Sequence, residues 1–121
     1  MRKQVLIVDD KESIAKVISV YLLEEYDVTY FENPLKAIAW MEGGNMPDLV
    51  LSDIHMPMME GDEFLRYLKS NKLFSTIPFV ILSAEDSSTS KIKLLELGAD
   101  DYIVKPFNPV ELKVRIKRIL K

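Results

Sequence analysis

Five polar residues stand out because each follows a short apolar run in the sequence. They are Asp9, Asp10, Asp53, Ser83 and Lys105. Clustered carboxylates repel one another and are normally tolerated because they bind a cation. Ligands that are all oxygens favour a hard divalent ion, and Mg²⁺ is the ion that we expect. A carboxylate beside such an ion is able to attack phosphorus and form an aspartyl phosphate, which a nearby ammonium and hydroxyl would stabilise.

The apolar runs before these residues are rich in β-branched side chains and predict five β-strands. The expected strands are Gln4–Val8, Val28–Phe31, Asp48–Ser52, Phe79–Leu82 and Tyr102–Val104. Several of these runs are apolar at consecutive positions, which is typical of strands that helices cover on both faces. The polar residues follow the first, third, fourth and fifth of these strands.

Segments with the apolar spacing of helices separate the strands. The first helix is expected after Ser13, and Asn33-Pro34 and Asn108-Pro109 each place an N-cap candidate before a proline suited to the first turn. Gly98 is expected to end the fourth helix. Five strands that alternate with five helices predict an α/β fold with an open, doubly wound parallel sheet. Because ligands bind beyond the carboxyl ends of such strands, we expect the polar residues to meet there.

Length and composition limit the possible functions. The 121 residues leave room for a single domain with one hydrophobic core. The formal net charge is −3, which gives no electrostatic reason to expect direct binding of nucleic acid. The absence of cysteine excludes disulfides, thiolate metal sites and cysteine nucleophiles. No apolar run has the length of a secretory signal or a membrane span, so we expect a cytoplasmic protein that does not contact membranes.

Each polar residue also has a simpler explanation. An Asp-Asp pair after a strand is often a polar turn, and a single Asp or Ser there often caps the next helix or turn. Lys105-Pro106 alone fits a solvated lysine before an extended dipeptide. These explanations require several coincidences, whereas one site at the strand ends accounts for all of the residues together.

Four longer motifs resemble the receiver domains of two-component response regulators. They are Val5–Asp10, Asp48–Asp53, Met56–Gly61 and Leu97–Phe107. The resemblance covers nearly the whole chain, and the order and spacing of the motifs are together highly specific. It implies a flavodoxin-like receiver fold with strand order 2-1-3-4-5 and a cis bond between Lys105 and Pro106. Residues 1–121 then form a receiver domain that stands alone or is cut from a longer protein.

The resemblance also assigns a role to each polar residue. Asp53 is the expected phosphoacceptor, which takes a phosphoryl group from a histidine kinase or a histidine phosphotransfer protein. Lys105 is expected to contact that phosphoryl group. Mg²⁺ is expected to bind Asp10, Asp53 and the backbone carbonyl of His55, with Asp9 acting through water. His55 is the only histidine, and a single imidazole among carboxylates is more often a rim residue, so only its carbonyl is assigned to the metal.

Ser83 and Tyr102 are the expected switch pair of such a domain. Ser83 stands where the family more often has threonine, and the substitution keeps the hydroxyl that would contact a phosphoryl oxygen. A shift of this hydroxyl toward the phosphoryl group would leave space for the tyrosine ring. In the unphosphorylated protein we therefore expect the Tyr102 ring to be outward or mixed.

Two other classes of function are weighed against a signalling switch. An aspartate-nucleophile phosphatase of the haloacid dehalogenase type also forms an acyl phosphate, but its signature places a second Asp where this chain has His55. A nucleotide-binding module would need a glycine-rich turn after the first strand, and Asp9-Asp10 would repel a pyrophosphate there. We therefore expect a switch that catalyses only its own phosphotransfer and autodephosphorylation, with the phosphatase as the alternative.

Charged residues on the fourth helix, fifth strand and fifth helix predict a partner surface. They are Lys91, Glu96, Asp100, Asp101, Glu111, Arg115, Lys117 and Arg118. Opposite charges on one face suit self-complementary pairing about a two-fold axis, although a solvated helix face with internal ion pairs has the same pattern. The pattern is similar to that of receivers attached to winged-helix DNA-binding domains. Receivers fused to hybrid kinases have a similar pattern on this face. We expect a weak homodimer, tightened by phosphorylation and mediated by pairs such as Asp101 with Arg115.

Overall fold

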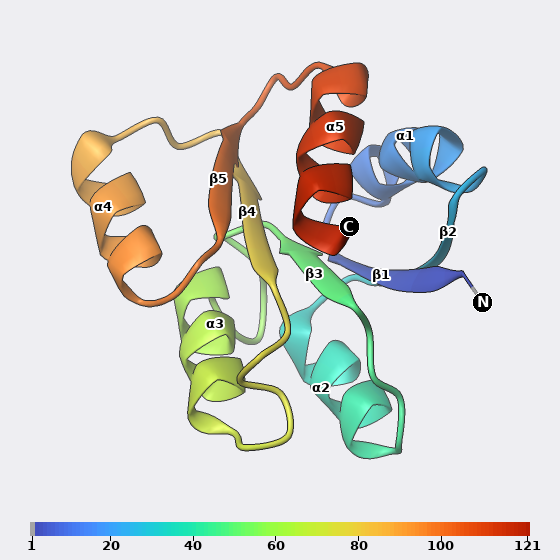
Figure 1. The fold of residues 1–121 in the computed structure, drawn as a ribbon. Helices are drawn as coiled ribbons and strands as arrows, with labels where there is room; N and C mark the ends of the chain where they lie inside the picture. Colours follow the sequence, from blue (N-terminus) through green and yellow to red (C-terminus); the bar gives the residue numbers. More distant parts are fainter. Residues whose placement is uncertain (1) are drawn as a thin grey trace.

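The computed structural model of the chain describes residues 2–121 as one sheet of five strands and five helices. The strands are β1 (Lys3–Val8), β2 (Tyr26–Phe31), β3 (Leu49–Ser52), β4 (Phe79–Ser83) and β5 (Asp101–Val104). The helices are α1 (Glu12–Leu22), α2 (Pro34–Glu42), α3 (Gly61–Ser70), α4 (Ser88–Glu96) and α5 (Pro109–Leu120). All strand pairs are parallel, in the order β2-β1-β3-β4-β5 (Figure 1). The predicted α/β fold and strand order are therefore confirmed.

Side chains along the strands alternate between two apolar layers. In β1, Val5 and Ile7 pack with α1 and α5, whereas Leu6 and Val8 pack with α2, α3 and α4. This alternation follows from the two-residue period of a strand, and both layers are closed because helices lie on both faces (Figure 1). The consecutive apolar residues of the central strands are thus explained by burial on both sides.

Most helix ends lie where the sequence predicts them. The side chains of Asn33 and Asn108 accept hydrogen bonds from backbone N–H groups in the first turns of α2 and α5. Gly98 adopts a φ of +113° just after α4, a conformation that glycine reaches without a side-chain clash. The predicted start of α1 was wrong, because the helix begins at Glu12 and Ser13 lies inside its first turn.

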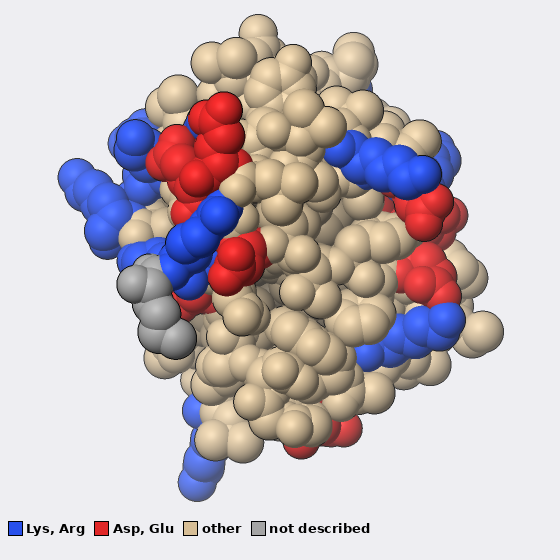
Figure 2. All heavy atoms as spheres, turned by 90° about the vertical axis from the view of Figure 1, so that its right-hand side faces the viewer, with Lys and Arg blue, Asp and Glu red and all other residues tan. Residues whose placement is uncertain are grey.

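The surface over α1 and the edge strand β2 is mostly uncharged at its centre, with charged side chains around it (Figure 2). Several apolar side chains of this part of the chain are exposed: Val17, Val20, Tyr21 and Leu23. No helix within residues 2–121 combines the length and the apolar character that a membrane crossing requires.

Candidate functional site

The carboxyl ends of β1 and β3 bring three acidic side chains together. Asp9 and Asp10 follow β1, and Asp53 follows β3, which pairs directly with β1. One carboxylate oxygen of each residue lies within 4.8 Å of the other two. Asp9 and Asp53 are buried, whereas Asp10 is exposed to solvent. The cluster therefore combines oxygen donors with an opening to water, as a hard divalent cation requires.

Lys105 follows β5 and places its ammonium between two of these acids. Its Nζ donates to Oδ2 of Asp9 at 3.0 Å and to Oδ2 of Asp53 at 3.2 Å. Burial by itself would lower the pKa of Lys105, but the hydrogen bonds and charges of Asp9 and Asp53 outweigh burial and raise this pKa. Lys105 therefore stays charged and neutralises part of the acidic cluster. Its peptide bond to Pro106 is cis, as predicted.

Asp9 is the most buried of the three acids. Its Oδ1 accepts a hydrogen bond from the backbone N–H of Lys11 at 2.9 Å, and its Oδ2 accepts from Lys105. Burial nevertheless raises the pKa of Asp9 above its usual value, because this effect exceeds the lowering by Lys11 and Lys105. Burial thus makes the charged form of Asp9 less favourable than it is in water, and an added cation would offset this charge.

The loop from β3 to α3 folds back against the backbone of Asp53. Oδ1 of Asp53 accepts a hydrogen bond from the N–H of Ile54 at 2.6 Å. The N–H of Gly61 donates to the carbonyl of Ile54, also at 2.6 Å. Gly61 is the last residue of the Met56–Gly61 motif, and a Cβ there would lie 2.3 Å from the carbonyl oxygen of Asp53. Only glycine therefore fits this approach of α3 to the end of β3.

Glu85 lies in the loop after β4 and contacts both the loop between β3 and α3 and the strand β5. Its Oε2 lies 2.9 Å from Nε2 of His55, while Nδ1 of His55 lies 3.1 Å from Oε2 of Glu60. The hydrogen bond to Glu85 is the main cause that raises the pKa of His55. The backbone N–H of Glu85 donates to Oγ of Ser83 at 3.1 Å, and its carbonyl accepts from the Tyr102 hydroxyl at 2.6 Å. The imidazole of His55 thus faces two glutamates and is separate from the aspartate cluster.

The predicted switch pair is only partly as expected. The Tyr102 ring is 9% exposed, and the ammonium of Lys91 lies 5.8 Å from its centroid. The expectation of an outward or mixed ring was wrong, because burial of the ring and the hydrogen bond to Glu85 stabilise an inward position. Ser83 is buried at the end of β4, and among residues 2–121 it makes no hydrogen bond to Asp53.

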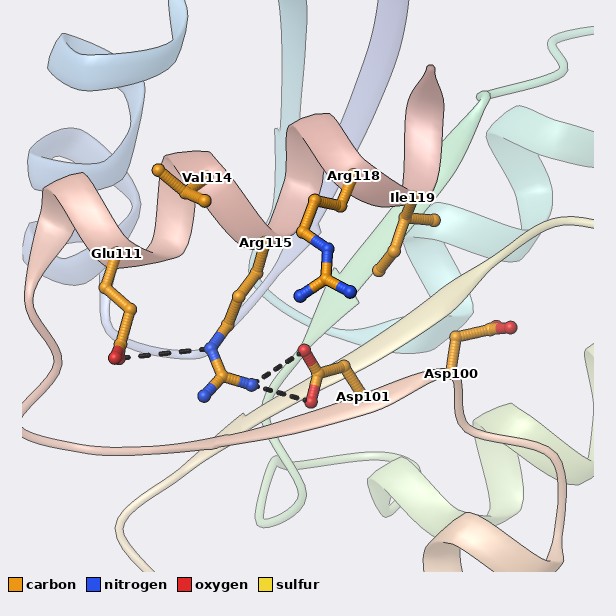
Figure 3. A pocket seen from close by; sticks show the side chains of 7 residues that line it. All are labelled: Asp100, Asp101, Glu111, Val114, Arg115, Arg118 and Ile119. Atoms are coloured by element: carbon orange, nitrogen blue, oxygen red, sulfur yellow. Dashed lines mark hydrogen bonds and ion pairs between the residues drawn. The ribbon is translucent and has the colours of Figure 1, made fainter.

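The predicted partner surface surrounds a hollow of about 610 Å³ between β5 and α5 (Figure 3). Nη1 of Arg115 donates to both carboxylate oxygens of Asp101, at 3.0 and 2.9 Å. Glu111 lies 3.9 Å from the same guanidinium. The pairing that we predicted between two copies is formed here within one chain, because β5 and α5 are neighbours and bring Asp101 under Arg115.

Other charged residues of this surface also pair within the chain: Lys91 with Asp86, Asp100 with Lys69, and Lys117 with Glu25. Glu96 and Arg118 are exposed and make no ion pair among the described residues. The apolar side chains of Ile92, Leu95 and Val114 are exposed on the same two helices, α4 and α5. Apolar contacts as well as charges are thus available on this surface.

Two residues that support the site could not be singled out from the sequence. Tyr30 donates its hydroxyl hydrogen bond to the carbonyl of Asp9 at 2.7 Å. Glu85 joins His55, Ser83 and Tyr102, as described above. The only signals in the sequence are positional: Tyr30 lies near the end of the strand beside β1, and Glu85 comes two residues after a strand-end hydroxyl.

Sequence comparisons place this chain in a known family. The family model for the response regulator receiver domain matches residues 5–117. The chain is 40% identical to the alkaline phosphatase synthesis transcriptional regulatory protein PhoP of Bacillus subtilis, over 100% of this chain and 50% of that protein. It is 42% identical to the phosphate regulon transcriptional regulatory protein PhoB of Pseudomonas aeruginosa, over 98% of this chain and 52% of that protein. The chain therefore spans about half the length of these relatives.

Solved structures agree with these relatives. The chemotaxis response regulator CheY4 of Vibrio cholerae superimposes with a TM-score of 0.91 at 31% identity, covering 99% of this chain and 100% of that one. The receiver domain of the Francisella response regulator 1452 gives a TM-score of 0.88 at 33% identity, covering 98% and 97%. The chain belongs to the family of response regulator receiver domains of two-component systems.

Membership in this family decides between the functions weighed above. Receiver domains are switches that histidine kinases phosphorylate, and they bind Mg²⁺ at an acidic pocket. The matches give no support to a phosphatase of the haloacid dehalogenase type.

Proposed function

We propose that this chain accepts a phosphoryl group on Asp53 from the phosphohistidine of a histidine kinase or a histidine phosphotransfer protein. The observation that carries the proposal is the position of the Asp53 carboxylate, which lies beside two further acids and within reach of the Lys105 ammonium. Asp10 is exposed with no hydrogen bond among the described residues, and Asp9 is buried more deeply than Asp53. Asp53 thus combines a fixed orientation with a side chain that is less buried than that of Asp9.

The residues around Asp53 supply what the transfer needs. An oxygen of Asp53 attacks phosphorus, the phosphorus–nitrogen bond breaks, and the imidazole leaves with the electron pair. The N–H of Ile54 holds Oδ1 in place, while the ammonium of Lys105 neutralises charge on the transferring group. The hydroxyl of Ser83 turns from Glu85 toward a phosphoryl oxygen. The chain thereby catalyses its own phosphotransfer and autodephosphorylation and turns over no other substrate.

Mg²⁺ fits the donors at this site because they are all oxygens and carry excess negative charge. Asp10, Asp53 and the backbone carbonyl of His55 would hold the ion, with Asp9 acting through water. When bound, the ion would offset the repulsion among the carboxylates and the charge on the phosphoryl oxygens.

Labelling with a small phosphoryl donor tests the proposed function. Incubation with an acyl or amido phosphate and Mg²⁺ should add one acid-stable, base-labile phosphoryl group, measured by intact-protein mass spectrometry. A matched sample with the metal chelated should label far more slowly, because the charge of the carboxylates would then repel the donor. A folded protein that no such donor labels in the presence of Mg²⁺ would contradict the proposal.

We also propose that phosphorylation strengthens a homodimer through α4, β5 and α5. Ile92 and Leu95 of α4 and Val114 of α5 supply exposed apolar contacts on this surface. Glu96 and Arg118 have no ion-pair partner among the described residues, so both are available to a second copy. A two-fold axis would bring the same surface of each copy together and allow opposite charges to meet.

Sedimentation of the beryllofluoride-treated protein tests this dimer. We expect a weak dimer at low salt that dissociates as ionic strength rises, because its exposed charges are screened. Arg118→Glu should weaken the dimer. The matched control is Lys72→Glu, which reverses the charge of an exposed residue after α3 and should leave the dimer unchanged. Charge reversal at Arg115 would give an ambiguous result, because it also breaks the ion pair with Asp101 inside the chain. A strict monomer at high concentration and low salt would rule the dimer out.

A further inference from the structure

Tyr30 reaches the backbone of the acidic cluster from the edge strand β2. Its hydroxyl donates a hydrogen bond to the carbonyl oxygen of Asp9 at 2.7 Å. The next residue of β2, Phe31, accepts a hydrogen bond from the N–H of Asp9 at 3.2 Å. Two neighbouring residues of one strand therefore hold the peptide groups on both sides of Asp9.

The carbonyl that Tyr30 holds belongs to the peptide group between Asp9 and Asp10. A peptide group is planar, so a fixed carbonyl also fixes the direction of the Asp10 N–H and limits rotation at this link. The side chain of Asp10 is exposed and makes no hydrogen bond or ion pair within residues 2–121. Because no side-chain contact among the described residues holds Asp10, the position of its carboxylate depends on its backbone.

The position of the Tyr30 ring is set by packing. The ring is half-buried, packs against the layer formed with α1 and α5, and lines a hollow of about 510 Å³ beside α1. Packing therefore holds the ring where its hydroxyl meets the Asp9 carbonyl.

We infer that Tyr30 is a positioning residue for the Mg²⁺ site. It holds the Asp9–Asp10 peptide so that the carboxylate of Asp10 stays beside Asp53, where the ion would bind. Tyr30 acts through the backbone and touches neither the ion nor the phosphoryl group. The inference rests on the proposed role of the acidic cluster as the metal site.

Calorimetric titration with Mg²⁺ tests the inference on the wild-type chain and two variants. Tyr30→Phe removes only the hydroxyl and should weaken Mg²⁺ binding about two- to tenfold, the range that loss of one hydrogen bond gives. Tyr67→Phe is the matched control, because its hydroxyl donates to Glu42 away from the acidic cluster. It should leave Mg²⁺ affinity unchanged. Both variants should unfold near the wild-type temperature without metal.

A second measurement separates a local effect on the Asp10 backbone from a general loss of stability. In ¹H–¹⁵N NMR spectra of the metal-free protein, Tyr30→Phe should shift or broaden the amide signal of Asp10, and Tyr67→Phe should not. Equal Mg²⁺ affinity in the wild type and in Tyr30→Phe overturns the inference but leaves the metal site intact. A wild-type chain that binds no Mg²⁺ overturns the metal site itself, and the inference falls with it.

Discussion

Asn in place of Asp53 should leave the chain unable to take up a phosphoryl group. The carboxylate of Asp53 is the proposed nucleophile, and a neutral amide is too weak a nucleophile to attack phosphorus. The change also removes one of the two anionic partners of the Lys105 ammonium, which lies 3.2 Å from Oδ2 of Asp53. We expect complete loss of labelling by an acyl or amido phosphate with Mg²⁺, measured by intact-protein mass spectrometry.

Asp48→Asn is the matched control for this experiment. The Asp48 carboxylate accepts a hydrogen bond from the N–H of Gln4 at 2.7 Å, at the opposite ends of β3 and β1 from the acidic cluster. The control should therefore label like the wild type. Asp53→Asn should keep its fold, because it removes one of three mutually repelling carboxylates while Lys105 retains Asp9. Labelling of Asp53→Asn at the wild-type level would show that another residue is the acceptor.

The position of the site could be predicted because it depends on chain topology. Parallel strands place their carboxyl ends at one edge, so residues that follow β1, β3 and β5 must come near one another once the strand order is known. Asp9, Asp10, Asp53 and Lys105 obey this rule, and the structure brings them together.

The side-chain partners around the site could not be predicted in the same way. Whether Tyr102 turns inward depends on a carbonyl acceptor at Glu85, which is set by the path of the loop after β4. Whether Arg115 pairs within the chain depends on how α5 lies over β5, and both arrangements have the same sequence pattern. The hydrogen bond of Tyr30 likewise depends on the register of β2 against β1. Such contacts are tertiary, and residue spacing alone does not specify them.

Ala in place of Gly61 should lower the free energy of unfolding by about 2–3 kcal/mol, the cost typical of forcing extra atoms into a packed site. The added Cβ would lie 2.3 Å from the carbonyl oxygen of Asp53 and 2.7 Å from Cα of Ile54. Both neighbours are backbone atoms at the end of the buried strand β3, so no flexible side chain is able to move aside. Either α3 shifts and its hydrogen bond to Ile54 breaks, or the end of β3 shifts.

Gly43→Ala provides the comparison in urea or thermal unfolding. A Cβ at Gly43 would lie 3.4 Å from its nearest neighbours, an ordinary contact, and the φ of −75° suits alanine. This control should change the free energy of unfolding by less than about 1 kcal/mol. Because the clash at Gly61 is with Asp53 itself, Gly61→Ala should also slow phosphoryl labelling in the fraction of protein that remains folded. Equal stability of the two variants would mean that α3 has more freedom than the 2.6 Å bond to Ile54 implies.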